Sequence, residues 1–532
     1  MKKRMLAVML AVTLMLAGTG GRLARLMAGG SGAAEAAAQI GKTVTVARPR
    51  GDFYDRNGRR LTGVQTRTVA VLPPTVAAVA ALTEQLAGDK AASALDSLKG
   101  GDPALVEVPS DFACADALTF TLPVRTVGSQ PAVHLLGYLD GSGHGVTGLE
   151  AAFDAWLSDQ PPLTVTYTVD ATGRPLAGLS PEVSGSPTAA HGIMLTLDNT
   201  IQRLAEEAAA PLETGALLVM ESATGNLLAA VSRPTFSPLN VAAALTAEHA
   251  PLVNRTLSAY NVGSVFKLCV AAAALKAGFS PGRTATCTGV TDVGGTLFHC
   301  HKKAGHGTLT MAGALENSCN CCFIDLGQAL GGRAILDLCV RLGFNRAYTL
   351  AEGLSAPAGT LPSESVLAAQ PAALANLSFG QGDLMLTPLH VAVMVAAIAN
   401  GGWQVTPQLV AGKVTGANVE RMENAAPRRV LSEEDTATLR AMMEGVVTHG
   451  TGRAAQPESG IAGGKTATAE TGWVVEGRTI QQAWFAGYWP ASGEYTIVVL
   501  REDGSGGAAD CAPVFKLCVA AAALKAGFSP GR

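Results

Sequence analysis

The sequence predicts an α+β fold in more than one domain, and three observations lead to this prediction. The chain has 532 residues, more than one ordinary domain holds. Its composition, 48 % hydrophobic and 15 % charged, can supply a large core. Strand-type stretches also gather near both ends of residues 190–513, with a long helical region between them. We therefore expect one sheet built from both ends of this domain, with helices on its two faces.

The first 28 residues are expected to direct the chain out of the cytoplasm. Three cations precede an apolar run from Met5 to about Ala17, an order typical of a secretory signal or a signal-anchor. The run is short, which favours a cleaved signal, but no A-x-A site follows it directly, which favours a single-pass membrane anchor. A buried helix of a cytosolic protein seldom begins behind three cations. With either export signal, the rest of the chain lies on the outer face of the cytoplasmic membrane.

Residues 40–187 are predicted to form a mixed α+β module behind a Gly/Ala/Ser-rich tether at 30–40. Short strands such as TVTVARP and LTVTYTV alternate with Ala-rich helical stretches. The module offers few groups for catalysis, and a structural role is favoured for its two histidines, His134 and His144. The net charge of −3 argues against nucleic acid as the main partner, because phosphate-binding surfaces are usually basic.

Residues 190–513 are predicted to form the second domain. IMLTLD reads as a strand, and Asn199 is expected to cap the helix that follows it. GALLVMESATGNLLAAVS predicts two strands joined by a turn, and helices follow to residue 448. After these helices, three more strands are predicted, in GIAGGKTATAET, QAWFAGYW and EYTIVVLR.

Three short motifs in this domain carry the candidate catalytic residues. Ser264 and Lys267 form S-x-x-K at the start of an Ala-rich helix, where residues three apart share a face and an apolar setting favours a neutral lysine. The second motif is S-x-N, at Ser318 and Asn320, and the third is K-T, at Lys465 and Thr466. Taken singly, Ser318 could be a helix cap and Lys465 an exposed strand lysine, but the ordered set of three is far more specific.

Longer stretches resemble the class B, monofunctional penicillin-binding transpeptidases. The family's early signature is similar to RGDFYDRNGRRLTG at 50–63, and its G-L-E segment to HLLGYLDGSGHGVTGLEAAFDAWL at 134–157. Its G-Q-G…T-P helix resembles LSFGQGDLMLTPLHVAVMVAAIANGG at 377–402. The resemblance covers nearly the whole chain. It implies an N-terminal pedestal and a serine transpeptidase/β-lactamase-like domain, in which helices cover an antiparallel five-stranded sheet and an all-α subdomain is added.

The resemblance also implies roles for the motif residues in a D,D-transpeptidase that cross-links peptidoglycan stem peptides. Ser264 would attack the penultimate D-alanine, Lys267 would take its proton, and Ser318 would relay a proton to the leaving D-alanine. The substrate would be held by Asn320, Lys465, Thr466 and Thr468, the last supplying an oxyanion-hole N–H with that of Ser264. β-Lactams would acylate the same serine. The implied partner is a separate membrane glycosyltransferase, and neither a metal nor an organic cofactor is expected.

One position departs from the family pattern. Ala467 follows K-T where the family usually has glycine, and K-T-G occurs nowhere in the chain. We expect the methyl group to narrow the approach to the site and to alter substrate or β-lactam fit without abolishing the reaction.

Three other activities fit parts of the pattern. A serine β-lactamase shares most motifs, but no E-x-x-N lies between the second and third motifs, and the N-terminal module is foreign to it. A D,D-carboxypeptidase differs only in using water as the acceptor, which sequence does not reveal. A non-catalytic wall-synthesis scaffold is disfavoured by the complete set of motifs.

The ten cysteines are many for an exported protein of this size. Cys287 and Cys300 flank a Gly-rich loop and could pair as a disulfide. A metal site at Cys300, His301 and His306 is conceivable, but their spacing matches no standard zinc pattern. No metal is therefore expected.

A stretch of 19 residues, VFKLCVAAAALKAGFSPGR, occurs twice without a mismatch, at 265–283 and at 514–532. Ser264 precedes the first copy and Pro513 the second, so Lys516 has no serine to activate. We interpret the second copy as a recombination or, preferably, an error in assembling the gene sequence, and expect an amphipathic helix in its place. Residues 514–527 should nevertheless form a helix on the outer face of the sheet.

Overall fold

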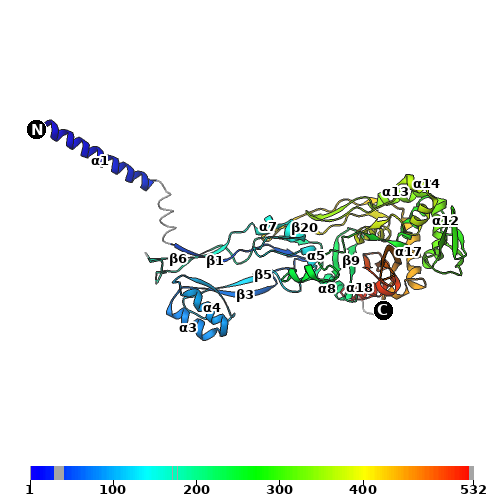
Figure 1. Ribbon diagram of the computed structural model, residues 1–532, viewed down its shortest axis with the longest axis horizontal. Coiled ribbons are helices and arrows are strands. Elements are labelled where there is room, and N and C mark those ends of the chain that lie inside the picture. The colour runs from blue at the N-terminus through cyan, green and yellow to red at the C-terminus, as the bar shows by residue number, and fades with distance from the viewer. Residues whose placement is uncertain (1, 29–40, 171, 177, 526–532) are drawn as a thin grey trace. The chain divides into compact units, whose positions relative to one another are not determined.

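The computed structural model describes residues 2–28, 41–170, 172–176 and 178–525 (Figure 1). Residues 2–28 form one helix, α1 (Lys2–Ala28), over the predicted export signal. Across the described ranges, no helix is both long enough and apolar enough to cross a membrane. The predicted tether at 30–40 lies outside the described residues.

The chain divides into two compact units. The first comprises 1–50, 64–124 and 158–189, and the second 51–63, 125–157 and 190–532. Two segments predicted for the N-terminal module, 51–63 and 125–157, therefore belong to the second unit. Arg125 explains part of this assignment, because its guanidinium lies 3.0 Å from Asp52 Oδ1 and 2.8 Å from Glu150 Oε1. These ion pairs join the two segments at a buried position.

Besides α1, the described part of the first unit contains two three-stranded antiparallel sheets and the helices α3 and α4. One sheet has the order β1-β6-β7 and the other β4-β3-β5. Helices α3 and α4 pack on the second sheet through a small apolar core. The bounds of these elements are β1 (Gly41–Ala47), β3 (Gln65–Leu72), α3 (Val76–Gln85), α4 (Gly88–Leu98), β4 (Ala104–Val108), β5 (Leu118–Val124), β6 (Leu163–Thr168) and β7 (Glu182–Ser184).

The predicted five-stranded sheet is present in the second unit, with the order β10-β9-β25-β24-β23 and every pair antiparallel. The two early strands thus form one edge and the three late strands the other, as Figure 1 shows by their green and orange-red colours. The bounds are β9 (Gly215–Glu221), β10 (Leu227–Arg233), β23 (Gly463–Val475), β24 (Arg478–Trp489) and β25 (Tyr495–Arg501).

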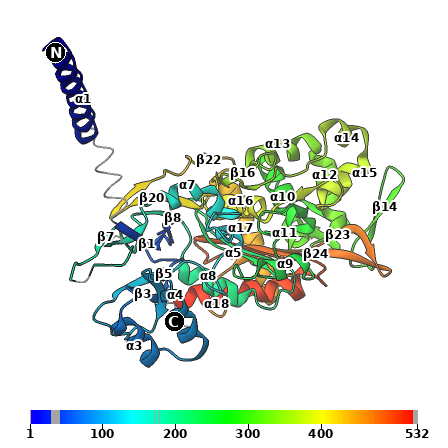
Figure 2. The same ribbon diagram turned by 60° about the vertical axis from the view of Figure 1, so that its left-hand side comes forward.

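Helices cover both faces of this sheet, as predicted. Along β9 the side chains of Leu218 and Met220 join one core, and those of Leu217 and Val219 join the other. Helix α16 (Pro388–Ala399) lies in the first core with all of its residues buried. Helices α8 (Asn199–Ala208) and α18 (Ala512–Lys525) run side by side over the opposite face (Figure 2).

The second unit contains another sheet, of four strands, that the sequence did not predict. Its order is β2-β8-β20-β21, with β2 and β8 parallel and the other pairs antiparallel. The predicted strand IMLTLD lies here as β8. The cap of the following helix, α8, is Asp198 and not Asn199, because the Asp198 carboxylate accepts from the N–H groups of Thr200 and Ile201. The bounds are β2 (Asp52–Tyr54), β8 (His191–Leu195), β20 (Val410–Thr415) and β21 (Asn418–Arg421).

The remaining helices build a mostly α-helical part around α10 (Lys267–Lys276), which is buried on all sides except at its last residue. Its neighbours include α12, α13 and α17. The bounds of the larger elements are α11 (Met311–Glu316), α12 (Asn320–Leu330), α13 (Gly332–Leu342), α14 (Glu364–Ala369), α15 (Pro371–Ser378) and α17 (Glu433–Thr448). Shorter helices of this unit are α5 (Val133–Leu136), α6 (Gly148–Ala152), α7 (Asp154–Ser158) and α9 (Val241–Thr246).

Four short strands form two small hairpin-like sheets between α10 and α11. β12 (Thr284–Cys287) pairs with β15 (Gly307–Thr310), and β13 (Val290–Val293) pairs with β14 (Thr296–His299). Further two-stranded pairs are β11 (Tyr260–Asn261) with β18 (Met385–Leu386), β16 (Tyr348–Ala351) with β17 (Leu354–Ala356), and β19 (Trp403–Gln404) with β22 (Arg428–Arg429).

The second copy of the repeated stretch forms the C-terminal helix of the described chain. The predicted helix over 514–527 is confirmed to Lys525, the last described residue. Val514, Phe515, Cys518 and Val519 are buried against the sheet, and the Phe515 ring lies 4.6 Å from that of Phe485.

Candidate active site

Ser264 lies in a short 3-10 turn, Gly263–Phe266, that leads directly into α10. Gly263 adopts a φ of +60°, a left-handed conformation that favours glycine. Its N–H donates to Gly380 O at 2.9 Å. A Cβ atom at Gly380 would lie 1.9 Å from Gly263 O, so only glycine fits there. The glycine-rich G-Q-G stretch therefore supports the backbone turn that presents Ser264, a role that the sequence did not reveal.

Lys267, the first residue of α10, is fully buried. Its Nζ donates to Ser318 O at 2.7 Å and to Asn320 Oδ1 at 2.8 Å, and it lies 5.6 Å from the centre of the Phe323 ring. Burial lowers the pKa of this amine to about 7, against an opposing effect of nearby cysteine thiolates. In the described chain it makes no hydrogen bond to the Ser264 hydroxyl. About half of this amine is therefore neutral at pH 7, one helical turn from that hydroxyl.

Ser318 and Asn320 flank Cys319, which precedes α12. Ser318 is not a helix cap, because the N-cap residue of α12 is Cys319. The φ of Ser318 is +50°, and its side chain contacts the lysines of the first and third motifs. A serine in this region is strained by about 1–3 kcal/mol. The Ser318 hydroxyl lies 3.4 Å from Lys267 Nζ and 2.9 Å from Lys465 Nζ. Ser318 therefore joins the first and third motifs.

Lys465 is buried within β23 and is not an exposed strand lysine. Its Nζ donates to Ser318 Oγ and to Thr466 O, the latter at 2.8 Å. Burial, together with the charge of Lys267, lowers its pKa well below the usual range. Two buried amines that share one hydroxyl repel each other when both are charged, so an anion would be attracted here.

The other predicted residues of β23 differ in exposure. Thr466 is nearly buried, and its hydroxyl lies 2.8 Å from that of Thr451, a neighbour that no sequence signal marked. Thr468 is exposed, and its carbonyl oxygen would lie 3.2 Å from a Cβ atom at Gly263. The K-T strand and the Ser264 turn therefore pack against each other.

The sequence predicted that the Ala467 methyl group narrows the approach to the site. In the structure, Ala467 does not line an open approach. Its side chain is 3 % exposed and belongs to the main core, opposite Trp484 of β24. Side chains alternate between the faces of a strand, so Ala467 points inward between the two threonines. Its methyl group contributes to packing.

The disulfide considered for Cys287 and Cys300 is not formed. All ten cysteines are free thiols in the described chain. Both of these residues are buried beside Cys319.

The three motifs thus meet from three elements: the turn before α10, the segment before α12, and the edge strand β23. Together they offer a hydroxyl, two buried lysine amines with lowered pKa values, a hydroxyl that bridges these amines, and an exposed threonine. A hydroxyl nucleophile with an adjacent base suits acyl transfer. A cation and hydroxyls beside it suit a substrate carboxylate.

Comparison with known proteins agrees with this chemistry. Residues 215–520 match the family model described as the penicillin binding protein transpeptidase domain. Stage V sporulation protein D of Bacillus subtilis is 28 % identical over 494 residues, which cover 86 % of this chain and 74 % of that protein. Peptidoglycan D,D-transpeptidase PbpA of Mycobacterium tuberculosis is 32 % identical over 341 residues, which cover 58 % of this chain and 67 % of that protein.

A solved structure extends the match beyond residues 215–520. A chain from a peptidoglycan synthase complex that coordinates polymerization and crosslinking superposes with a TM-score of 0.69 at 25 % identity. The match covers 97 % of this chain and 98 % of that one. With the family model spanning more than half of the sequence, the chain belongs to the penicillin-binding protein transpeptidase family.

Proposed function

We propose that Ser264 forms the acyl-enzyme of a peptidoglycan D,D-transpeptidase that cross-links stem peptides. The observation that supports this most is the convergence of Lys267 Nζ and Lys465 Nζ on the single hydroxyl of Ser318, beside the turn that holds Ser264. Chance motifs in a long chain would not meet in this way. The enzyme is a serine-type acyltransferase that β-lactams inhibit covalently.

Acylation begins when the Ser264 hydroxyl attacks the carbonyl of the penultimate D-alanine. Lys267 accepts the hydroxyl proton, because burial leaves about half of its amine neutral at pH 7. The oxyanion is held by the backbone N–H groups of Ser264 and Thr468. Lys465 and Thr466 bind the terminal carboxylate of the stem, and Asn320 binds its amide.

The leaving D-alanine departs when its nitrogen gains a proton. Ser318 passes this proton from Lys267, since its hydroxyl lies within 3.4 Å of that amine. An amine from a neighbouring strand then attacks the ester of Ser264 and gives up a proton to Lys267. Lys267 passes this proton to Ser264 Oγ as the ester bond breaks, which restores the serine hydroxyl and the neutral amine. The products are one cross-linked peptide and one free D-alanine.

The chain is proposed to act outside the cytoplasmic membrane, where its substrate lies, with residues 1–28 as its membrane anchor. The cations before the apolar run support this placement. A separate glycan-polymerising glycosyltransferase is the proposed partner. The related chain solved within a complex for polymerization and crosslinking supports that pairing.

The repeated stretch supplies a matched test of this assignment. Lys267→Ala should abolish labelling by a fluorescent penicillin, because it removes the base. Lys516→Ala changes the same lysine of the same sequence, but this side chain is 40 % exposed and lies 3.7 Å from Glu458. It should label as the unchanged protein does. Equal labelling of the two variants would contradict the assignment of Lys267.

The acceptor is tested with a stem peptide that ends in D-Ala-D-Ala and an added amine. A transpeptidase releases D-alanine and forms a product that contains both peptide and amine. Release of D-alanine with water as the only acceptor would make the protein a D,D-carboxypeptidase. No release by folded, penicillin-labelled protein would favour the scaffold.

A further inference from the structure

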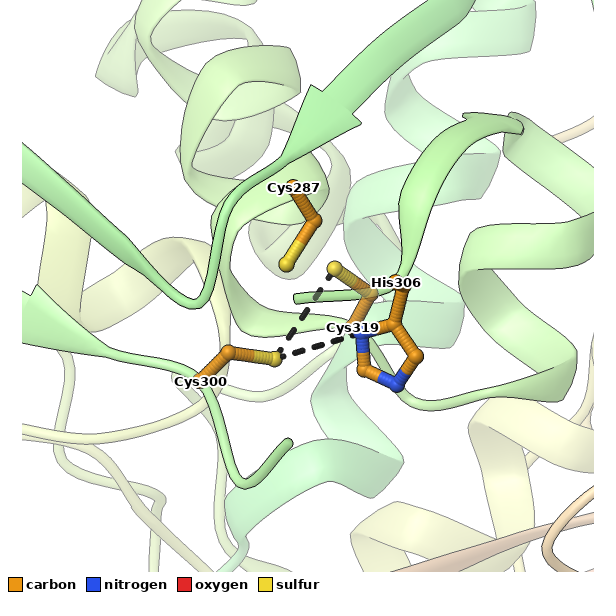
Figure 3. A group of neighbouring side chains, drawn as sticks. All are labelled: Cys287, Cys300, His306 and Cys319. Atoms are coloured by element: carbon orange, nitrogen blue, oxygen red, sulfur yellow. Dashed lines mark hydrogen bonds between the residues drawn. The ribbon is translucent and has the colours of Figure 1, made fainter. Parts of the chain in front are cut away.

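Four side chains with metal-ligand chemistry converge beside the S-x-N motif, as Figure 3 shows. They are Cys287, Cys300, His306 and Cys319, and their ligand atoms all lie within 4.8 Å of one another. Cys287 ends β12, Cys300 follows β14, His306 precedes β15, and Cys319 precedes α12. Four separate points of the chain thus supply one ligand each. We propose that they bind one structural zinc ion.

Two of the distances between ligand atoms in the cluster match a tetrahedral zinc site. With zinc–sulfur bonds of about 2.3 Å and a zinc–nitrogen bond of about 2.0–2.1 Å, a tetrahedron has S···S edges of roughly 3.8 Å and S···N edges of roughly 3.6 Å. The Sγ atoms of Cys300 and Cys319 are 3.9 Å apart, and His306 Nδ1 is 3.5 Å from Cys300 Sγ. Three sulfurs and one imidazole nitrogen are a ligand set typical of structural zinc.

The segment around the cluster lacks an apolar core of its own. Within residues 284–310, the buried positions are two cysteines and two glycines: Cys287, Gly289, Cys300 and Gly305. Two small sheets with exposed side chains cannot supply the apolar burial that holds a fold together. A metal that joins their ends to Cys319 would replace that core.

The surroundings also suit a bound thiolate. The backbone N–H groups of Lys302 and Asn320 lie near the Cys300 sulfur, where they favour its thiolate form. Such outer contacts orient ligands at metal sites. Three thiolates, one neutral imidazole and Zn²⁺ carry a net charge of −1, and Lys302 and Lys303 lie in the loop between Cys300 and His306.

The proposed metal acts as a positioning element for the reaction. Cys319 lies between Ser318 and Asn320, and Lys267 Nζ binds both of these neighbours. A metal bond to Cys319 would therefore hold the strained Ser318 backbone and the polar atoms around the Lys267 amine. With four protein ligands, the site has no open position for substrate, so its role is structural. This consequence rests on the proposed function, whereas zinc binding itself does not.

The first test measures metal in the full chain, purified with a reductant and without chelator. We expect about one zinc per chain, and visible bands of tetrahedral cobalt–thiolate when Co²⁺ is added to chelator-treated protein. His306→Ala and Cys287→Ser should lose the zinc. His301→Ala and Cys114→Ser are matched controls and should keep it, because neither residue belongs to the cluster although His301 Nδ1 lies 3.9 Å from Cys300 Sγ.

Several outcomes would overturn the proposal. Folded wild-type chain without zinc and without cobalt bands would do so, as would a disulfide between two of the four ligands in peptide maps. Equal zinc loss in His301→Ala and His306→Ala would exclude the assigned ligand. If the ligand variants do not fold, cobalt titration of chelator-treated wild-type chain still decides the question.

The positioning role is tested separately, with penicillin labelling of the chelator-treated chain. We expect slower labelling that Zn²⁺ restores, and a lower melting temperature without the metal. Unchanged labelling of zinc-free protein would refute the positioning role alone. Absence of labelling in the zinc-loaded protein would instead contradict the proposed function, so the two failures are distinguishable.

Discussion

At the scale of single residues, the site depends on buried amines. Lys267 and Lys465 are both fully buried, and each costs solvation energy when charged. The Ser318 hydroxyl, between them, gives each a partner. In the proposed mechanism, burial prepares Lys267 as a base, and Lys465 becomes a binding group once a carboxylate arrives.

The pH dependence of acylation follows from this burial. The Lys267 pKa of about 7 lies far below that of a lysine in water, so the neutral, proton-accepting form gains as pH rises through 7. The other charged groups that act on it are Lys465 and the thiolates near Ser318. We expect acylation by penicillin to be about tenfold faster at pH 8 than at pH 6. Stopped-flow labelling measures it, and a flat profile across this range would contradict the role of Lys267.

Ala467→Gly tests the one departure from the family motif. Because the methyl group packs in the core, its loss should cost about 1 kcal/mol of stability, from lost burial and added backbone freedom. The acylation rate should change by less than about tenfold, or ~1.4 kcal/mol. Denaturant unfolding and penicillin labelling measure the two effects. A larger loss of rate at unchanged stability would show that Ala467 shapes the site.

At the scale of elements, the repeated stretch forms two helices with identical sequence and different surroundings. In α10, Leu268 is fully buried, as are the residues on every side. In α18, the equivalent Leu517 is 49 % exposed, while Phe515 and Cys518 face the sheet. A helix on an outer face usually carries polar residues there, so the exposed leucine fits the interpretation that the second copy is out of place.

The two leucines give a matched pair of substitutions. Leu268→Ala should destabilise the second unit by about 2–5 kcal/mol, because it leaves a cavity in the core. Leu517→Ala should change stability by less than about 0.5 kcal/mol. Urea unfolding followed by the fluorescence of the buried Trp484 and Trp489 measures both. Equal losses would contradict the placement of one helix inside and the other at the surface.

At the scale of the whole molecule, the central sheet could be predicted because its strands are apolar runs at both ends of one domain. The second sheet could not, because β2 is only three residues long and pairs with a strand far along the chain. Because such long-range pairing is not visible in the sequence, residues 51–63 and 125–157 were predicted to belong to the N-terminal module. Their attachment depends on the charge cluster at Arg125, which sequence spacing does not reveal.

The residues of the three motifs could be predicted to lie together, but the contacts that support them could not. Their order along the chain indicates the proposed nucleophile, base and binding groups. The contact between Thr451 and Thr466 and the close approach of Gly380 to Gly263 join distant segments, so no local pattern marks them. The complete four-residue cluster was also not predicted. Its possible ligands are spread over 33 positions, from Cys287 to Cys319, with no standard metal-site spacing.

The most direct measurement for the central claim is the mapping of the residue that penicillin acylates. The full chain is labelled, digested and analysed by mass spectrometry, with Ser264→Ala as the control. We predict one modified peptide, which carries the adduct on Ser264, and no adduct in the folded Ser264→Ala variant. An adduct on any other residue, or undiminished labelling of that variant, would contradict the assignment of Ser264 as the nucleophile.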